Sequence, residues 1–324
     1  MDIYIDDIFH DFINDIFNSG NLNIIDSIVC DVLLKYPETK WFFEIKMDIQ
    51  NHTDLEKLKK YPLLFSKTGN NFLPIPISSI KDEIFKNGKV YDQVMVFTFE
   101  EKPWFEEAEK MGVLCFSSNN YKQKIQEIIE NNHFKKDLSE SDFSWNFLEK
   151  IKTMPYSEVI ISDNYILANK SNQLVEKNIY KIIHYFSQRN SVNLQIMIFT
   201  KDFGLPRNST DQQIKSSAEL SLNALKTKFA TSNLSFSIYN LEHAGSFDFH
   251  DRIIMHNFLM IECGKGFNLI PHKSSNSQIN ALTVFDLYTY KRMKNLKREY
   301  NKLVNKLENN MGGYQTLKFK YVKS

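Results

Sequence analysis

The chain has 324 residues, a formal net charge of +1 and a hydrophobic fraction of 42%. Its length predicts two domains, each able to bury a core of its own. A charge this close to zero excludes a global field that draws the chain to nucleic acid, so such binding has to come from local patches. The sequence has neither a basic, apolar leader nor an apolar run of bilayer length, so we expect no membrane association.

The cysteine pattern bears on the compartment. Cys30, Cys115 and Cys263 are far apart and each lies in an apolar run. This pattern is typical of reduced core thiols and not of a disulfide framework or a zinc site. We therefore expect a cytoplasmic protein.

The first predicted elements are a helix and a hairpin. Residues 3–18 place isoleucines and phenylalanines at helical spacing, which predicts an amphipathic helix. Residues 28–34 and 41–46 are rich in β-branched and aromatic side chains, which predicts two strands. The polar residues 35–40 between them include Pro37 and predict a turn. We expect the two strands to pair antiparallel.

An alternation of helix and strand follows the hairpin. Residues 54–61 predict a short helix, and residues 72–77, with Pro74 and Pro76, an irregular or edge segment. The next elements are predicted to be a strand, a helix and a strand, at residues 90–98, 103–111 and 113–116. A strand, helix, strand order implies a right-handed crossover and a parallel pair.

Three polar residues interrupt the apolar hairpin. Glu44 and Lys46 share one face of their strand, and antiparallel pairing can bring Asp31 to that face. With the surrounding element order, this acid, acid-x-lysine pattern resembles the PD-(D/E)XK, or restriction-endonuclease-like, nucleases over roughly residues 1–130. The resemblance implies a mixed sheet flanked by helices, and catalysis of DNA hydrolysis by these three residues. It also implies Mg²⁺ or Mn²⁺ held by Asp31, Glu44 and the backbone carbonyl of Ile45.

Other interpretations of these acids remain open. The two carboxylates can be ordinary solvent-facing residues of a hairpin, with Lys46 as an ion-pair partner. Asp26 is a rival first acid. Asp11 or Asp15 of the opening helix can add a ligand, although a solvated helix face explains both equally well.

The second half predicts a further α/β domain over residues 154–324, joined to a nuclease-like domain (1–132) by a linking helix (133–153). Strands are predicted at residues 157–161, 192–199, 234–239, 252–262 and 314–321. Helices are predicted at residues 174–188, 211–229 and 283–307.

One motif of the second half carries polar residues at a defined spacing. His250, Arg252, Asn257 and Gly264 resemble the histidine, lysine, aspartate and glycine signature of phospholipase D, with arginine for lysine and asparagine for aspartate. The stretch is also similar to the phospholipase-D-like C-terminal domain of MIT-domain proteins. The resemblance implies a domain that recognises a phosphate through His250, Arg252, Asn257 and Lys265. Arginine can still bind a phosphate, whereas asparagine lacks the negative charge of the aspartate.

A basic stretch lies in the last predicted helix. Its cations include Lys291, Arg292, Lys294, Lys297 and Arg298. They can contact a nucleic-acid backbone or form a solvated face. The apolar stripe of the same helix can be a dimer seam.

Together these features predict a metal-dependent DNA nuclease, of the kind found in bacterial restriction or antiviral defence, with a C-terminal domain that recognises nucleic acid, a phosphate ligand or a partner chain. One alternative is a phosphodiesterase that uses His250 in a homodimer, since phospholipase D chemistry joins two copies of the motif. The other alternative is a non-catalytic interaction or targeting module.

Overall fold

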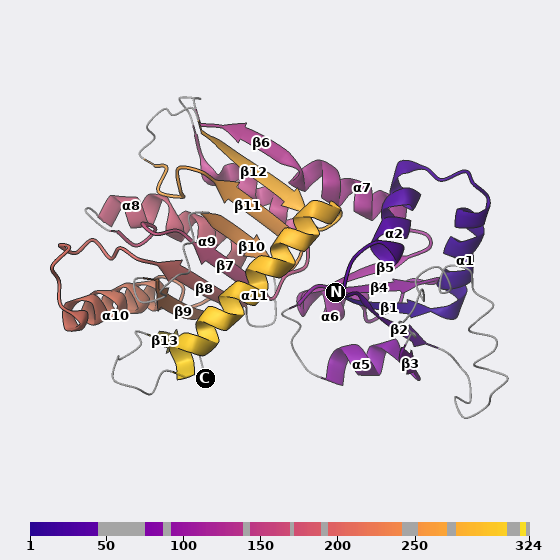
Figure 1. Ribbon diagram of the computed structural model, residues 1–324, viewed down its shortest axis with the longest axis horizontal. Coiled ribbons are helices and arrows are strands. Elements are labelled where there is room, and N and C mark those ends of the chain that lie inside the picture. Colours follow the sequence, from indigo (N-terminus) through magenta and orange to yellow (C-terminus); the bar gives the residue numbers. More distant parts are fainter. Residues whose placement is uncertain are drawn as a thin grey trace. The chain divides into compact units, whose positions relative to one another are not determined.

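The computed structural model describes residues 1–44, 75–86, 92–138, 143–168, 172–188, 194–241, 252–270, 277–309 and 318–321. The chain divides into two compact units, each built around one sheet (Figure 1). The first unit comprises Met1–Glu130 and Val284–Lys291, and the second comprises Asn131–Thr283 and Arg292–Ser324. The α/β class is thus confirmed. Within the described ranges, no helix combines the length and the apolar character needed to cross a bilayer.

A five-stranded sheet with the order β3-β2-β1-β4-β5 forms the centre of the first unit. Its strands are β1 (Asp2–Asp6), β2 (Lys40–Glu44), β3 (Ile75–Ile77), β4 (Val94–Thr98) and β5 (Val113–Ser117). The resemblance implies a mixed sheet, but the pairings that link these five strands are all parallel. The predicted parallel pair of residues 90–98 and 113–116 is confirmed by β4 and β5, and the proline-bearing segment 72–77 supplies the edge strand β3.

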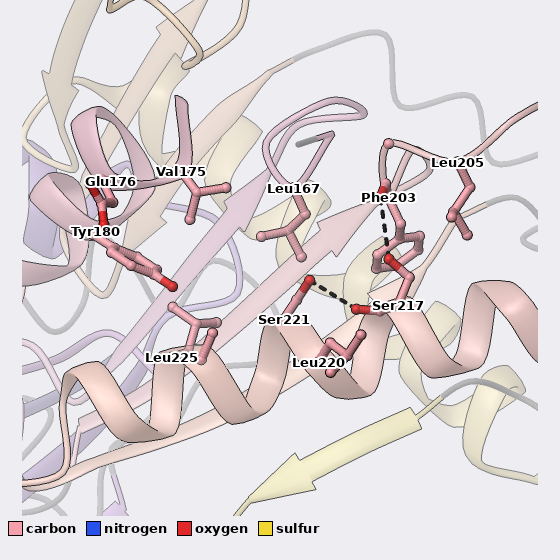
Figure 2. A pocket seen from close by; sticks show the side chains of 12 residues that line it. Leu167, Val175, Glu176, Tyr180, Phe203, Leu205, Ser217, Leu220, Ser221 and Leu225 are labelled. Atoms are coloured by element: carbon pink, nitrogen blue, oxygen red, sulfur yellow. Dashed lines mark hydrogen bonds between the residues drawn. The ribbon is translucent and has the colours of Figure 1, made fainter. Parts of the chain in front are cut away.

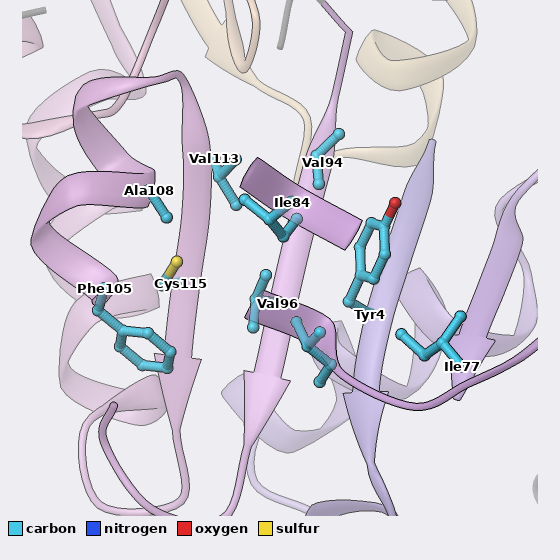
Figure 3. Close-up of a cluster of buried hydrophobic side chains, with 10 residues drawn as sticks. Tyr4, Ile77, Ile84, Val94, Val96, Phe105, Ala108, Val113 and Cys115 are labelled. Atoms are coloured by element: carbon cyan, nitrogen blue, oxygen red, sulfur yellow. The ribbon is translucent and has the colours of Figure 1, made fainter. Parts of the chain in front are cut away.

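Helices cover both faces of this sheet. They are α1 (Asp7–Asn18), α2 (Ile24–Leu34), α5 (Ile80–Lys86), α6 (Phe105–Lys110) and α7 (Tyr121–Asn132). On one face, Ile84 of α5 and Phe105 of α6 pack with Tyr4, Val96 and Cys115 of the strands (Figure 3). Parallel strands covered on both faces read as continuous apolar runs, and β4 and β5 are buried along their whole length.

Aromatic side chains fill the opposite face. Phe9 of α1 lies 5.3 Å from Phe97 of β4 and 5.9 Å from Tyr121 of α7, measured between ring centroids. Phe97 in turn stacks on Phe116 of β5 at 5.0 Å. Ring pairs at these separations add stabilisation beyond their buried area. The first unit is therefore a three-layer α/β/α arrangement.

The predicted strand at residues 28–34 is wrong, because these residues belong to α2. Asn23 caps the helix by accepting a hydrogen bond of 2.9 Å from the backbone N–H of Asp26. The buried positions Asp26, Val29, Cys30 and Leu33 recur at helical spacing. Since β2 pairs parallel with β1 and β3, the antiparallel hairpin does not exist.

The opening of the chain also differs from the prediction. Residues 3–6 form most of β1, the central strand, and only residues from Asp7 onward are helical. Asp6 caps α1 by accepting a 2.7 Å hydrogen bond from the backbone N–H of Phe9. The apolar residues Ile3 and Ile5 are completely buried.

The second unit contains an eight-stranded sheet with the order β13-β9-β8-β7-β10-β11-β12-β6. Its strands are β6 (Phe134–Asp137), β7 (Glu158–Ser162), β8 (Leu194–Thr200), β9 (Leu234–Asn240), β10 (Ile253–His256), β11 (Leu259–Cys263), β12 (Gln278–Thr283) and β13 (Lys318–Tyr321). β7, β8 and β9 are parallel to one another, and the other pairings are antiparallel. The strands predicted at 157–161, 192–199 and 234–239 are confirmed over the residues that the structure describes, and the segment 252–262 splits into β10 and β11.

The helices of the second unit are α8 (Asn172–Lys177), α9 (Ile179–Ser187), α10 (Asp211–Lys228) and α11 (Leu287–Asn309), whose first turn belongs to the first unit. Thr210 starts α10 with a capping box, in which its side chain and that of Gln213 exchange hydrogen bonds with the backbone. The region expected to be one linking helix, 133–153, instead contains β6 and a 3₁₀ helix, η1 (Trp145–Thr153).

Within the second unit, α11 runs across one face of the sheet (Figure 1). Tyr300 of α11 lies 4.7 Å from Phe199 of β8, measured between ring centroids, and Leu303 is completely buried. On the opposite face, Phe186 of α9 packs against Tyr156 and His256. Tyr300 and Leu303 of the apolar stripe of α11 therefore pack against the sheet of their own chain, whereas Tyr288 of the same stripe is exposed.

Candidate functional site

The predicted metal ligands Asp31 and Glu44 occupy different kinds of structure. Asp31 lies in the last turn of α2, where its half-exposed carboxylate pairs with Lys35 at 2.6 Å. Glu44 ends β2, and its Oε1 atom accepts a 3.0 Å hydrogen bond from the backbone N–H of Ile80 at the start of α5. Both carboxylates thus have local structural partners. Ile45 and Lys46 lie outside the described residues.

The two acids also lie toward opposite ends of β2. Asp31 is within one helical turn of the end of α2, and five residues connect that helix to Lys40 at the start of β2. Glu44 is four residues further along the strand, or about 13 Å. Oxygen ligands of one cation lie about 2.0–2.6 Å from it, so this placement does not form a shared metal site. In the described ranges, no group of three or more His, Cys, Asp or Glu side chains is arranged to hold a metal.

Two of the three rival acids, Asp26 and Asp11, have side-chain partners too. Asp26 is buried in α2, where it accepts hydrogen bonds from the Tyr121 hydroxyl at 2.5 Å and from Lys122 at 3.1 Å. Asp11 is exposed on α1 beside His10. Asp15 lies on the same helix, and its backbone carbonyl accepts a hydrogen bond from Ser19 N–H. None of the three forms a pair with Glu44.

Ligands of open parallel sheets bind where the strand order reverses, at the carboxyl ends of the strands. In the first unit this position lies between β1 and β4 and is occupied by Asp6. Besides capping α1, its carboxylate accepts a 2.9 Å hydrogen bond from the backbone N–H of Phe99, which follows β4. Burial raises the pKa of Asp6, and these backbone donors oppose that shift. Asp6 therefore joins two loops at this edge.

The second unit brings charged groups together at the edge where β7, β8 and β9 end. Ile253 pairs with Ser162, so Arg252, one residue before β10, stands across from Asp163, one residue after β7. Cys263, the last residue of β11, donates its backbone N–H to the carbonyl of Arg252 at 3.1 Å. This register gathers the ends of three strands into one candidate site.

Asp163 is the buried anchor of this edge and is 2% exposed. Its Oδ1 atom accepts a 2.8 Å hydrogen bond from the Tyr165 N–H, and its Oδ2 atom accepts one of 2.6 Å from the Phe267 N–H. Burial raises the pKa of this carboxyl, whereas the two N–H donors and the neighbouring Arg252 guanidinium oppose the rise. Asp163 thus ties the loop after β7 to the turn after β11.

The turn after β11 packs directly against these two side chains. Gly266 has a φ of +84°, which L side chains rarely adopt. A Cβ atom at this position would lie 2.5 Å from Asp163 Oδ2 and 2.9 Å from Arg252 Cδ. The position therefore requires glycine for both conformation and space.

Arg252 is held at this turn with donors to spare. Its Nη1 atom donates a hydrogen bond to the Gly264 carbonyl. Its Nε atom is buried and has no hydrogen-bond partner among the residues that the structure describes. Lys265, between the two glycines, is exposed. The arrangement presents a guanidinium and an ammonium at one turn, a combination suited to an anion.

The remaining residues of the phospholipase-D-like motif are not at this turn. Asn257 follows β10 at the opposite end of that strand, where His256 pairs with Val159. It is buried, and its Oδ1 atom accepts a 3.1 Å hydrogen bond from the Ser157 N–H. Asn257 therefore supports the fold and does not join Arg252. His250 lies outside the described residues.

Two of the basic residues of α11 form ion pairs with carboxylates of the sheet. Arg292 forms an ion pair with Glu262 of β11, and Lys297 forms one with the buried Glu158 of β7. Lys291 and Arg298 are exposed, and Lys294 is partly exposed. The prediction that all five cations contact nucleic acid therefore needs correction for Arg292 and Lys297, because their charges neutralise carboxylates of the sheet.

Sequence reasoning missed Asp163. A signal was present, because Asp163 and Asn164 follow the apolar run 159–161 after a single residue, Ser162, at the carboxyl end of a parallel strand. Comparisons of the chain with protein-family models, with curated proteins and with solved structures find no match.

Proposed function

We propose that the second unit recognises phosphate-bearing ligands at the turn after β11, through Arg252 and Lys265. The observation that carries the proposal is the guanidinium of Arg252, which is held by the Gly264 carbonyl near the Asp163 carboxylate, while its Nε donor has no partner in the described parts of the chain. A guanidinium that is already positioned loses little conformational entropy when it binds an anion.

The surroundings of Arg252 favour an anionic ligand over a cationic one. The only charge that the described site sets against Arg252 and Lys265 is the buried carboxylate of Asp163, and both its oxygens already accept backbone N–H donors. A phosphate would therefore meet two cations and the backbone of a glycine turn. The phospholipase-D-like resemblance implies a third phosphate contact, from His250, which precedes Arg252 by two residues.

The nuclease function predicted for the first unit stays a prediction without a placed site. Neither Asp31 nor Glu44 supports it in the arrangement described above. Recognition without cleavage is also consistent with Asn257, which replaces the acid of the family signature and pairs with the backbone of Ser157.

The proposal is tested by titrating the protein with sodium pyrophosphate in a calorimeter. Lys265→Gln removes one exposed cation without disturbing a buried group, and Arg252→Lys keeps the charge but loses the forked geometry. Each is expected to weaken binding about tenfold, the value of one charge-assisted hydrogen bond. Lys302→Gln, which removes an exposed lysine of α11, is the charge-matched control.

Two outcomes would reject the proposal: no binding by the wild-type protein, or equal binding by wild type, Lys265→Gln and Arg252→Lys. A parallel assay for cleavage of bis(p-nitrophenyl) phosphate examines the phosphodiesterase alternative. Cleavage that disappears in His250→Ala would assign catalysis, and not recognition alone, to this turn.

A further inference from the structure

A second feature of the same unit is a cavity of 540 Å³ between α10 and the loops that follow β7 and β8 (Figure 2). This volume falls in the range of about 300–1,000 Å³ typical of small-molecule sites. Its apolar wall is formed by Leu167, Phe203, Leu205, Leu220 and Leu225. Leu220 is 71% exposed, so the cavity opens to solvent beside an exposed apolar side chain.

Polar groups are interspersed with this apolar wall. Ser217 and Ser221 of α10 enter the cavity, and their hydroxyls donate to the carbonyls of Phe203 and Ser217 at 3.3 and 3.0 Å (Figure 2). Each hydroxyl oxygen retains acceptor capacity. Tyr180 and Glu176 line the same cavity. Burial and the nearby Glu176 raise the pKa of Tyr180, so its phenol stays protonated and can donate at neutral pH.

A smaller cavity of 210 Å³ adjoins the first and shares Phe203 and Leu205 with it. Lys201 and Arg207 contribute two cations to its lining. Neither has an ion-pair partner among the residues that the structure describes. The third charged residue of this cavity, Asp202, accepts a 2.6 Å hydrogen bond from the Gly204 N–H and thereby shapes the loop. The smaller cavity therefore carries a net positive charge.

The two cavities adjoin each other. The larger one is apolar with aromatic and hydroxyl groups, and the smaller one is cationic. Together they match a ligand that has a flat heterocycle and a phosphate. A hydrocarbon chain would leave the donor of the Tyr180 phenol and the acceptor capacity of the Ser217 and Ser221 hydroxyls unused where it displaces water, which is costly. A nucleobase has N–H donors for Glu176 and for the hydroxyl oxygens, and ring nitrogens or carbonyls that can accept from the Tyr180 phenol. Its faces can stack on aromatic rings. Lys201 and Arg207 then meet the phosphate.

The geometry points to a nucleotide site in which the base occupies the 540 Å³ cavity and the phosphate lies against Lys201 and Arg207. The nucleotide is either a free mononucleotide or the terminal residue of a strand. This site uses none of the residues proposed above for phosphate recognition, so the two proposals stand or fall separately.

The test measures binding of ATP, GTP, CTP and UTP to the full chain by calorimetry, with adenosine and inorganic triphosphate as partial ligands. A 5′-phosphorylated hexanucleotide separates the two sources of the ligand, since a strand-end site binds it more tightly than the mononucleotides. At least one nucleotide is expected to bind more tightly than either partial ligand, because each partial ligand fills one cavity alone.

Two variants probe the two cavities, each with a matched control. Ser221→Phe fills the larger cavity and is expected to abolish nucleotide binding, whereas Ser216→Phe places the same ring on an exposed position of α10 and leaves binding unchanged. Arg207→Gln removes an exposed cation and is expected to weaken nucleotide binding about tenfold. Lys228→Gln removes an exposed cation from the end of α10 and is the control for charge. Because Arg207 is exposed, its result does not depend on how well Ser221→Phe folds.

Several results would overturn the inference. One is the absence of binding by every nucleotide, and another is inorganic triphosphate that binds as tightly as ATP. Binding that survives both Ser221→Phe and Arg207→Gln also overturns it. If that surviving binding is lost in Lys265→Gln, the nucleotide lies at the turn after β11, which supports the proposed function and rejects this cavity.

Discussion

The Oδ2 atom of Asp163 accepts a 2.6 Å hydrogen bond from the backbone N–H of Phe267. This bond joins the end of β7 to the turn after β11, two segments about a hundred residues apart in sequence. Because the same turn positions Gly264 against Arg252, the candidate phosphate site depends on a carboxylate that no ligand would touch. Asp163 is in this sense a positioning residue.

Replacing Asp163 by asparagine is expected to destabilise the protein by about 1–3 kcal/mol, the cost of leaving a buried donor unsatisfied. The variant keeps one acceptor oxygen, but its amide group opposes the N–H of Phe267 or of Tyr165. Urea unfolding measures the difference. Asp31→Asn is the control, because its exposed pair with Lys35 is expected to contribute less than about 1 kcal/mol.

The cost of Asp163→Asn should also depend on pH. Burial raises the pKa of this carboxyl in the folded state, so protonation favours folding. The proton-linked contribution is complete below the ordinary value of 3.8 and is lost as the pH rises through the higher folded-state pKa. The difference in unfolding free energy between wild type and variant is therefore expected to shrink from pH 4 to pH 7. A difference that grows over this interval would show that the folded state lowers the pKa.

The Tyr36 hydroxyl should contribute measurably to the stability of the first unit. It donates a buried 2.6 Å hydrogen bond to the carbonyl of Val284, and its ring stacks on Tyr290 at 4.7 Å. Tyr36→Phe keeps the ring and leaves the carbonyl unpaired, at an expected cost of about 1–3 kcal/mol. Tyr185→Phe removes an exposed bond to Asn146 and is expected to be nearly neutral. If thermal unfolding shows that the two variants lose the same stability, the assigned difference in burial between the two hydroxyls is contradicted.

The ion pair between Lys297 and Glu158 should anchor α11 to its sheet. Glu158 is 8% exposed, so Lys297→Met leaves a buried carboxylate without its partner, at an expected cost of about 3–5 kcal/mol. The double variant Glu158→Gln/Lys297→Met is expected to recover most of this loss, because it buries no charge. Lys302→Met, on the exposed side of the same helix, is the matched control. A double variant as unstable as Lys297→Met would show that the pair itself is not the source.

The placement of Asp31 leads to a prediction about metal binding. Because Asp31 and Glu44 lie toward opposite ends of β2, Asp31→Ala is expected to bind Mn²⁺ as the wild-type protein does. Electron paramagnetic resonance of free Mn²⁺ counts the bound ions in each. A single Mn²⁺ that binds wild type and is lost from both Asp31→Ala and Glu44→Ala would restore the predicted nuclease site.

Parts of the fold could be predicted from local patterns. The run Val113–Phe116 is apolar at every position and forms the buried strand β5, and the helix at Asp211–Lys228 follows its capping box. The strand prediction for residues 28–34 was wrong because their β-branched side chains favour a strand. In the structure, Asn23 caps a helix here, and the face of that helix with Val29 and Leu33 is buried. Tertiary packing decided between two patterns that the segment permits.

The candidate site was harder to predict, because it depends on strand order. The spacing of Arg252 and Gly264 indicated a phosphate motif, and these residues do meet at one turn. Asp163 is about ninety residues earlier, and only the antiparallel pairing of β7 with β10 brings it there. Asn257 fits the same motif but lies at the other end of β10, since successive residues of a strand move about 3.3 Å along it.

The most direct test of phosphate recognition is a titration of ¹⁵N-labelled protein with sodium pyrophosphate, followed by amide chemical shifts. We expect saturable shifts of Gly264, Lys265 and Gly266, with Asn257 unchanged and with a weaker response in Lys265→Gln. Saturable shifts confined to other segments, or shifts at this turn that Lys265→Gln leaves unaltered, would contradict the assignment of phosphate binding to Arg252 and Lys265.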